Sequence, residues 1–320
     1  MRQLALMKNR VRQHPSGYPD NPTQSAGFRV IKDSTYGFRR LDPIPPEAEL
    51  NGFYESHYYD LLRKGGRAPE LRRLMEGGDV AANELRWLRD GIYTDIVKVL
   101  DEIAPGQRLL EVGCGTGEFL GFSQERGFRG VGTELALEAT QLAVSKGLTV
   151  YNMTLDKFAA HSGPEKFDVV VMINVLEHVP DAVKTLRACR QLLVPSGILC
   201  VRVPNDFSEI QAAAQEKIGE GPWWIAVPDH INYFNFASLR QTLDLLGIET
   251  VCAQGDFPME MFLLMGENYI ANPEVGGRCH ARRVQFDLGL QPELRRKIYS
   301  ALGSAGVGRT CLVFGKKLHS

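Results

Sequence analysis

The chain has 320 residues, of which 44% are hydrophobic and 23% charged, as is typical of a soluble globular protein with one large domain and appendages. The net charge of −1 argues against a protein that binds nucleic-acid phosphates, so no nucleic-acid partner is expected. No apolar run approaches the roughly 20 residues that span a bilayer, and the N-terminus has too few apolar residues for a secretion signal, so we expect a cytoplasmic protein with no membrane partner.

The first quarter of the chain is rich in proline, glycine and aromatic residues. Residues 1–27 predict little regular structure, whereas 28–31 and 38–41 predict two short strands around a turn. A proline-rich connection, a short helix and an aromatic cluster follow. We therefore expect residues 1–82 to form a leader or lid, and residues 83–320 to form the main domain, which begins with a helix that ends near Ile103.

Strand and helix patterns alternate after this helix. The expected strands are continuous apolar runs, which suit a parallel sheet buried on both faces. They lie at 108–112, 130–134, 149–152, 167–173, 198–203, 248–254 and 310–315. Helical patterns lie at 118–126, 136–146, 154–160, 181–193 and from Asn235 to Gly247. Such alternation predicts right-handed β-α-β units in a three-layer sandwich.

Residues 256–308 separate the last two expected strands. This stretch is too long for a hairpin loop, so we interpret it as an insertion with a helix near 292–302.

The stretch Leu109–Leu120 (LLEVGCGTGEFL) places a glycine-rich turn between a strand and a helix. This arrangement brings backbone close to a ligand at the carboxyl edge of a sheet. The glycines, Gly113, Gly115 and Gly117, do not follow the G-x-G-x-x-G spacing of dinucleotide-binding turns. Glu111, just before the turn, suits a ligand with a positively charged amino group better than a pyrophosphate. A nicotinamide dehydrogenase is therefore disfavoured.

Glu134 closes the second strand of the alternation, seventeen residues after Gly117. An acid at this spacing can accept hydrogen bonds from both ribose hydroxyls of a nucleoside. An acid there also suits the dipole at the start of the next helix. The glycine motif upstream favours the ribose interpretation.

The segment E-V-G-C-G-T-G-E resembles the first motif of class I methyltransferases, which use S-adenosylmethionine (SAM). The resemblance covers residues 28–255 and 309–317, and it implies SAM as cofactor and S-adenosylhomocysteine (SAH) as product. After the third strand, Asp156 either reaches the adenine amine or caps the next helix. The residues expected to contact SAM are Glu111, Gly113, Cys114, Gly115, Gly117, Glu134, Leu135, Thr154, Leu155, Asn174, Val175 and Glu177.

The fourth strand and its loop, FDVVVMINVLEHVPD, resemble the branch of this family with L-E-H after the strand. That branch includes ubiquinone-biosynthesis-type O-methyltransferases and many sugar and small-molecule methyltransferases. His178 in L-E-H is a candidate general base, because an ordinary histidine pKa lies near 6.5. His230 is the second candidate: it follows Asp229 in an H-I-N-x-F segment that resembles a narrower subgroup. Each histidine has the alternative role of ordering its loop.

Aromatic residues near the H-I-N-x-F segment are candidates for the substrate wall. Trp223, Trp224 and Tyr233 either pack as a lid or contact a partly apolar or ring-shaped substrate. Tyr58 and Tyr59 of the leader are placed on the opposite wall.

Relatives in this narrower subgroup carry a C-x-x-C-G zinc element in the leader. The matching stretch here, residues 33–37, has no cysteine, so we expect no metal. The six cysteines are scattered without C-x-x-C pairs, as expected of buried thiols in a reducing compartment. Cys279 and His280 are too few to hold zinc by themselves.

The resemblance implies an α/β fold, namely a Rossmann-like three-layer sandwich with a mostly parallel seven-stranded sheet, an antiparallel last strand, an N-terminal leader and a C-terminal insertion. It also implies a SAM-dependent methyltransferase that acts on a small molecule, most simply on a sugar or phenolic hydroxyl. The alternatives are a catalytically silent SAM-binding protein, and a methyltransferase acting on carbon, on nitrogen or on a macromolecule. The sequence does not predict an oligomeric state.

Overall fold

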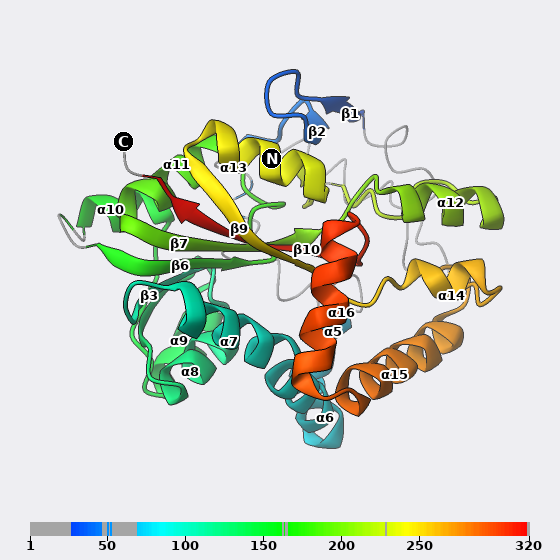
Figure 1. Cartoon of the computed structure of the whole chain (residues 1–320), viewed down its shortest axis with the longest axis horizontal. Coiled ribbons are helices and arrows are strands. Elements are labelled where there is room, and N and C mark those ends of the chain that lie inside the picture. Colours follow the sequence, from blue (N-terminus) through cyan, green and yellow to red (C-terminus); the bar gives the residue numbers. More distant parts are fainter. Residues whose placement is uncertain are drawn as a thin grey trace.

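The computed structural model describes residues 27–46, 50, 52, 69–161, 163, 166–227 and 229–318. A seven-stranded sheet lies at its centre, in the order β5-β4-β3-β6-β7-β10-β9 (Figure 1). The strands are β3 (Arg108–Val112), β4 (Arg129–Thr133), β5 (Val150–Tyr151), β6 (Phe167–Ile173), β7 (Leu193–Pro204), β9 (Ile248–Gly255) and β10 (Thr310–Lys317). Strands β5, β4, β3, β6 and β7 pair in parallel, and β10 pairs antiparallel with both β7 and β9. The predicted fold class is therefore confirmed.

The strands of this sheet are buried on both faces because alternate side chains point to opposite sides. In β3, Leu110 packs into one apolar core and Leu109 into the other. In β6, Val170 joins the first core, whereas Val169 and Val171 join the second. A continuous apolar run is therefore the pattern that this sheet needs.

Helices fill both outer layers. On one face lie α10 (Leu155–His161), α11 (Ala182–Leu192) and α13 (Phe236–Leu245), which supply side chains to the first core. On the other face lie α8 (Glu118–Glu125) and α7 (Thr94–Ile103), which supply the second core. The predicted helices agree with the observed bounds to within one or two residues at most ends, as does α9 (Leu137–Ser145). Among the helices of the described ranges, none combines the length and the apolarity needed to cross a membrane.

The helix expected to end near Ile103 begins earlier than predicted and is not uniform. It consists of α6 (Gly78–Leu88), a π-helical turn η1 (Arg89–Tyr93) and α7, and α5 (Pro69–Glu76) precedes it. The turn contains Gly91, whose φ of −95° and ψ of −108° depart from helical values. The sequence does not predict this change from α-helix to π-helix, because a single glycine inside an apolar periodic pattern does not indicate it.

The region 256–308 is helical and packs against the N-terminal helices. It contains α14 (Glu260–Leu264), α15 (Pro273–Gly289) and α16 (Pro292–Ser304); α15 packs against α6 and η1, and α16 packs along β9 (Figure 1). The helix predicted near 292–302 is α16. The prediction missed α15, whose polar sequence packs through specific hydrogen bonds, such as that from Trp87 Nε1 to Asp287 (2.8 Å).

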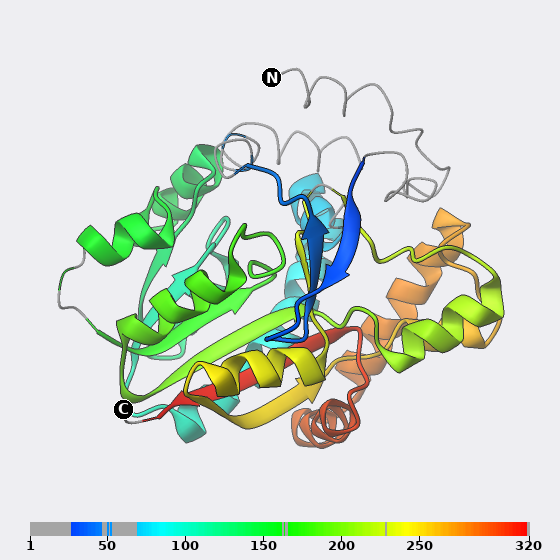
Figure 2. The ribbon, with the colours of Figure 1, turned by 90° about the horizontal axis from the view of Figure 1, so that it is seen from above.

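A small second sheet joins the leader to the main domain. The predicted strand pair appears as β1 (Arg29–Lys32) and β2 (Arg39–Asp42), and β2 pairs antiparallel with β8 (Asn232–Tyr233). Asp33 shapes the intervening turn, because its side chain accepts hydrogen bonds from the backbone N–H groups of Thr35 and Tyr36 (both 2.9 Å). Figure 2 shows the hairpin in blue beside the yellow-green segment that carries β8. Sequence reasoning missed both β8 and α12 (Glu209–Ile218).

Candidate functional site

The glycine turn follows β3 and leads into α8, as predicted. Gly113, Gly115 and Gly117 have φ values of 67°, 53° and 81°, which lie in the region that favours glycine. A Cβ atom on Gly113 would approach Val175 Cγ2 to 2.6 Å. One on Gly117 would approach Leu148 Cδ1 to 2.3 Å. The turn therefore needs glycine for its backbone conformation and for its close packing.

Glu134 follows β4 and reaches the glycine turn. Its carboxylate accepts hydrogen bonds from the backbone N–H groups of Gly115 (2.9 Å) and Ala136 (2.8 Å). Burial raises the pKa of Glu134, and the bonds from Ala136 and Gly115 oppose that shift. Glu134 therefore orders the start of α9, and its two oxygens retain further lone pairs. Ribose binding by these oxygens stays a prediction.

Glu111 is a buried carboxylate at the end of β3. Its Oε2 atom has no hydrogen-bond partner within the described part of the chain. Burial raises the pKa of Glu111 well above its ordinary value, and the nearby charge of Glu134 adds to the shift, whereas a backbone hydrogen bond from Leu120 opposes it. A buried acceptor of this kind fits a ligand that brings a positively charged amine, as SAM does.

The segment after β5 lies against the same edge. Asn152 donates through Nδ2 to the carbonyl oxygens of Glu134 (3.0 Å) and Leu135 (2.9 Å). These bonds connect the segment after β5 with the segment after β4. The side chain of Thr154 accepts a hydrogen bond from the N–H of Lys157 (3.3 Å), and Leu155 begins α10 and is buried.

Asp156, for which two roles were open, lies in the first turn of α10. It forms an ion pair with Lys184 of α11 (2.5 Å). Thr154, rather than Asp156, therefore occupies the capping position of that helix.

Asn174 and Val175 follow β6, and Val175 packs against Gly113 of the glycine turn. Asn174 has a φ of 55°, and its N–H donates to the carbonyl of Arg202 on β7 (2.8 Å). Arg202 returns a hydrogen bond from Nη1 to Asn174 Oδ1 (3.0 Å). These two bonds fix the backbone that places Val175 against Gly113.

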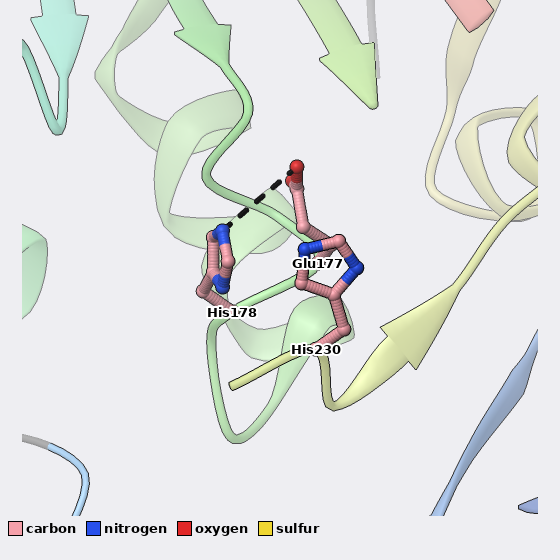
Figure 3. Close-up of side chains that lie close together, drawn as sticks. All are labelled: Glu177, His178 and His230. Carbon is pink, nitrogen blue, oxygen red and sulfur yellow. Dashed lines mark ion pairs between the residues drawn. The ribbon is translucent and has the colours of Figure 1, made fainter. Parts of the chain in front are cut away.

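The two candidate bases lie side by side next to Glu177 (Figure 3). The rings of His178 and His230 are 4.8 Å apart between centroids and nearly perpendicular, at 82°. His178 Nε2 lies 4.0 Å from Glu177 Oε1, an ion-pair distance if the imidazole is protonated. The structure therefore brings together two histidines that are 52 residues apart in the sequence.

The tautomer of His178 follows from its surroundings. Its Nδ1 atom is 2.8 Å from the carbonyl oxygen of Asp229. Because a carbonyl can only accept, Nδ1 must carry the proton, and in the neutral ring Nε2 then carries the lone pair. Nε2 is thus the atom of His178 that can accept a proton.

Glu177 is 2% exposed, and its Oε2 atom has no hydrogen-bond partner among the residues that the structure describes. Burial raises the pKa of Glu177 to about 8, the charge of Asp206 adds to this, and Arg202 opposes it. A carboxylic acid in this state can exchange a proton near neutral pH.

The H-I-N-x-F segment holds the L-E-H loop in place. The backbone N–H groups of Ile231 and Asn232 donate to the carbonyl of Glu177 (2.7 and 3.0 Å). The side chain of Asn232 donates to the carbonyls of Leu176 (3.0 Å) and Val179 (2.7 Å). Sequence reasoning missed this role of Asn232, although the presence of both motifs in one chain was a signal for it.

Glu177, His178 and His230 also form the group of potential metal ligands found in the described ranges, with ligand atoms within 4.8 Å of one another. An ion bound at about 2.1 Å spans at most about 4.2 Å between two ligands, so this group would have to contract to hold one. Cys279 and His280 do not face one another: Cys279 Sγ contacts Glu267 (3.6 Å), and His280 pairs with Glu84 (2.9 Å). All six cysteines are free, and all but Cys252 are buried.

The predicted substrate aromatics are only partly placed. Trp223, Trp224 and Tyr233 are buried in a third apolar cluster, together with residues of the hairpin and α14 such as Leu41 and Leu263. This burial fits the packing role, and contact with a substrate stays a prediction. Tyr58 and Tyr59 lie outside the described residues.

Comparisons with known proteins find relatives of this chain. A family model described as a methyltransferase domain matches residues 85–253, more than half of the chain. A ubiquinone biosynthesis O-methyltransferase of Haemophilus ducreyi is 33% identical over 111 residues, which make up 31% of this chain and 46% of that protein. One of Idiomarina loihiensis is 34% identical over 180 residues, 52% of this chain and 72% of that protein. The chain spans about half the length of most of the curated relatives it matches.

Solved structures show the same fold. A SAM-dependent methyltransferase from Archaeoglobus fulgidus has a TM-score of 0.50 at 17% identity, with 81% of this chain and 100% of that chain covered. A magnesium protoporphyrin IX methyltransferase from Synechocystis, solved with bound SAH, has a TM-score of 0.51 at 14% identity, with 85% and 100% covered. At these identities the likeness concerns the fold alone.

Proposed function

The chain belongs to the class I SAM-dependent methyltransferases, and we propose that it transfers the methyl group of SAM to a hydroxyl of a small molecule, either a sugar or a phenol. The names of the relatives support oxygen as the acceptor atom, since they are O-methyltransferases. The observation that carries the proposal is the position of His178: its Nε2 bears a lone pair, and it lies in the loop whose Val175 packs against Gly113 of the glycine turn.

The residues of this chain fit SAM at three points. Glu111 offers a buried acceptor to the amino group, and Glu134 offers two oxygens to the ribose hydroxyls. Gly113 and Gly117 give the turn its positive-φ backbone and its close packing against Val175 and Leu148, which brings backbone to this edge of the sheet. When bound, SAM supplies a methyl group on a positively charged sulfonium, and holding an acceptor behind that methyl is worth roughly 7–11 kcal/mol of barrier.

His178 is assigned the role of base. With SAM bound as the methyl donor, the acceptor hydroxyl would give up its proton to Nε2 of His178 as its oxygen takes the methyl group. The carbonyl of Asp229 keeps Nδ1 protonated and so leaves the lone pair of the neutral ring on Nε2. The imidazolium that forms lies 4.0 Å from Glu177 Oε1, so its positive charge favours ionisation of that buried carboxyl, and the ionised carboxylate then pairs with it. Base catalysis of this kind contributes about 10²–10⁴-fold.

His230 is the second candidate for the same role. Its ring packs edge-on against that of His178. It comes from the segment that holds the L-E-H loop, so its replacement could also act through the position of His178. The two roles differ in their pH dependence, because only the base itself titrates in the rate.

The test is production of SAH from SAM with a panel of sugar and phenolic acceptors. We expect His178→Ala to lower kcat at least about 100-fold while SAM affinity stays normal, and to remove the acidic limb of the pH–rate profile. His161→Ala, an exposed histidine on α10, is the matched control and should behave as the wild type. Full turnover by His178→Ala with an unchanged profile would refute the assignment of the base. SAM binding without turnover of any acceptor would favour a catalytically silent SAM-binding protein.

A further inference from the structure

A second group of buried polar atoms lies beside this site and has no role in holding SAM or moving the proton. Asp206 is 2% exposed, Gln211 on α12 is 1% exposed, and Glu260 on α14 is 1% exposed. Each has a side-chain oxygen with no hydrogen-bond partner in the described part of the chain. These atoms are Asp206 Oδ2, Gln211 Oε1 and Glu260 Oε2.

Asp206 anchors this group at the carboxyl edge of the sheet. It follows the end of β7, the strand next to β6, and its N–H donates to the carbonyl of Phe234 (2.7 Å). Its negative charge raises the pKa of Glu177, which places the two carboxyl groups within electrostatic reach. The group therefore adjoins the place where the base and the methyl group are expected to meet.

Two contacts link the other members to Asp206. The amide of Gln211 points at Asp206, with Nε2 3.5 Å from Oδ1, and leaves its oxygen unpaired. Arg309 donates to Glu260 (3.3 Å) and acts electrostatically on Asp206, where it lowers the pKa that burial raises to about 7. Two carboxylates and one amide oxygen thus share one buried region.

Unpaired donors occur in the same region. The indole N–H groups of Trp223 and Trp224 and the hydroxyl of Ser208 are buried, and they lack hydrogen-bond partners among the described residues. Phe207 stands between Asp206 and Ser208 in the chain, and its ring centroid lies 5.5 Å from that of Trp224. The ring centroids of Trp223 and Trp224 are 4.9 Å apart. We call these six residues, Asp206, Ser208, Gln211, Trp223, Trp224 and Glu260, the polar group.

Native proteins pair most of their buried polar atoms, because an unpaired one costs stability. Six such residues in one region, with donors and acceptors mixed, indicate a ligand that supplies the missing partners. A hydroxyl both donates and accepts, so several hydroxyls on one ring can satisfy both kinds of atom. An ammonium group only donates, and a phenol offers few polar atoms beside a large apolar face.

We propose that the polar group binds the acceptor, and that this acceptor is a sugar ring or a similarly polyhydroxylated ring. The unpaired oxygens of Asp206, Gln211 and Glu260 accept from its hydroxyls, and the indole N–H groups donate to them. Aromatic rings beside the group cover its apolar C–H face. The inference rests on the proposed methyl transfer. Of the two acceptor classes proposed there, sugars and phenols, it selects sugars.

The test combines turnover with a direct binding signal. The probes are methyl glycosides of neutral hexoses and deoxyhexoses, with catechol and an aminohexose as contrasting arms. We expect SAH formation with glycosides, and quenching of tryptophan fluorescence when glycosides are added to the protein with SAH bound. Asp206→Asn and Glu260→Gln should each raise the KM for a glycoside at least tenfold and leave the Kd for SAM unchanged. Asp244→Asn, an exposed carboxylate on α13, is the matched control.

The outcomes separate this inference from the proposed function. Turnover of catechol alone, with no quenching by glycosides, would overturn the sugar assignment and leave methyl transfer standing. Quenching by glycosides without turnover of any acceptor would support the sugar site and refute the methyl transfer. Preference for the aminohexose over every neutral glycoside would contradict the inference, because an ammonium group only donates and so leaves the donors of the polar group without partners. If Asp206→Asn does not fold, Glu260→Gln decides, and an unchanged KM in that variant counts against the proposal.

Discussion

The glycine turn offers a substitution whose cost can be worked out from the structure. In Gly113→Ala the new residue keeps a φ of 67°, which costs an L-residue roughly 1–2 kcal/mol. Its Cβ would stand 2.6 Å from Val175 Cγ2, 0.8 Å inside the 3.4 Å limit of ordinary contact. Overpacking of this kind costs about 1–3 kcal/mol. We therefore expect the free energy of unfolding to fall by roughly 2–5 kcal/mol, the sum of these two ranges.

Two further variants separate the conformational cost from the steric one. Gly147 has a φ of 83°, and a Cβ atom there meets nothing within 4 Å, so Gly147→Ala should cost only the conformational part. Adding Val175→Ala to Gly113→Ala removes the clashing methyl group and should recover much of the steric part. The two residues touch, so the double-mutant cycle should give a coupling of about 1–3 kcal/mol.

Urea denaturation of these three variants, and of Val175→Ala to complete the cycle, measures the stabilities, and calorimetry measures their affinity for SAM. We expect SAM affinity to fall in Gly113→Ala, because Val175 and the turn can no longer approach each other, and to stay normal in Gly147→Ala. Equal destabilisation in Gly113→Ala and Gly147→Ala, together with wild-type SAM affinity in both, would refute the reasoning.

Three other predictions follow from the site. Glu134→Ala should weaken SAM and SAH together by at least about tenfold, because a charged hydrogen bond is worth about 1.5–3 kcal/mol; an unchanged Kd for SAH by calorimetry would argue against ribose binding. The raised pKa of Glu177, about 8 against an ordinary 4.5, means that its contribution to stability is fully present below pH 4.5 and is lost as the pH rises through 8. That loss is at most about 5 kcal/mol. Between pH 4.5 and 9 the free energy of unfolding should therefore fall less steeply in Glu177→Gln than in the wild type. An identical slope in the two proteins would contradict the raised pKa of Glu177. Elemental analysis should find no stoichiometric zinc, since residues 33–37 of the leader contain no cysteine; one zinc per chain that His178→Ala removes would overturn this and assign the metal to Glu177, His178 and His230.

The parts of the fold that the sequence predicts are those set by local chemistry. The run FDVVVMI can only be a strand buried on both faces, and β6 has the predicted bounds of Phe167–Ile173. The glycines of the turn and the acid at Glu134 identify a ligand-binding edge because their spacing is local to one β-α-β unit.

The parts that the sequence does not predict depend on contacts between distant segments. The strand β8 has only two residues, Asn232 and Tyr233, and it forms because β2 of the leader pairs with it. The bonds from Asn232 to the L-E-H loop span more than 50 residues. Arg295 and Asp95, which pair at 2.7 Å, are 200 residues apart. The hydrophobic periodicity of a sequence is local, so it does not predict pairings between such distant residues.

The same kind of long-range contact connects the 256–308 region to the cofactor edge. Asp256 is buried and accepts hydrogen bonds from Arg283 of α15 (2.7 Å) and from Arg202 of β7 (3.3 Å). Arg202 in turn holds Asn174, whose positive φ sets the backbone beside the glycine turn. Removing one partner from a buried charge network leaves the others uncompensated, and this costs far more than the pair contributes at a surface. The region that reads as an insertion is therefore tied to the geometry of the SAM site through three side chains, so its helices belong to the same structural unit as the chemistry.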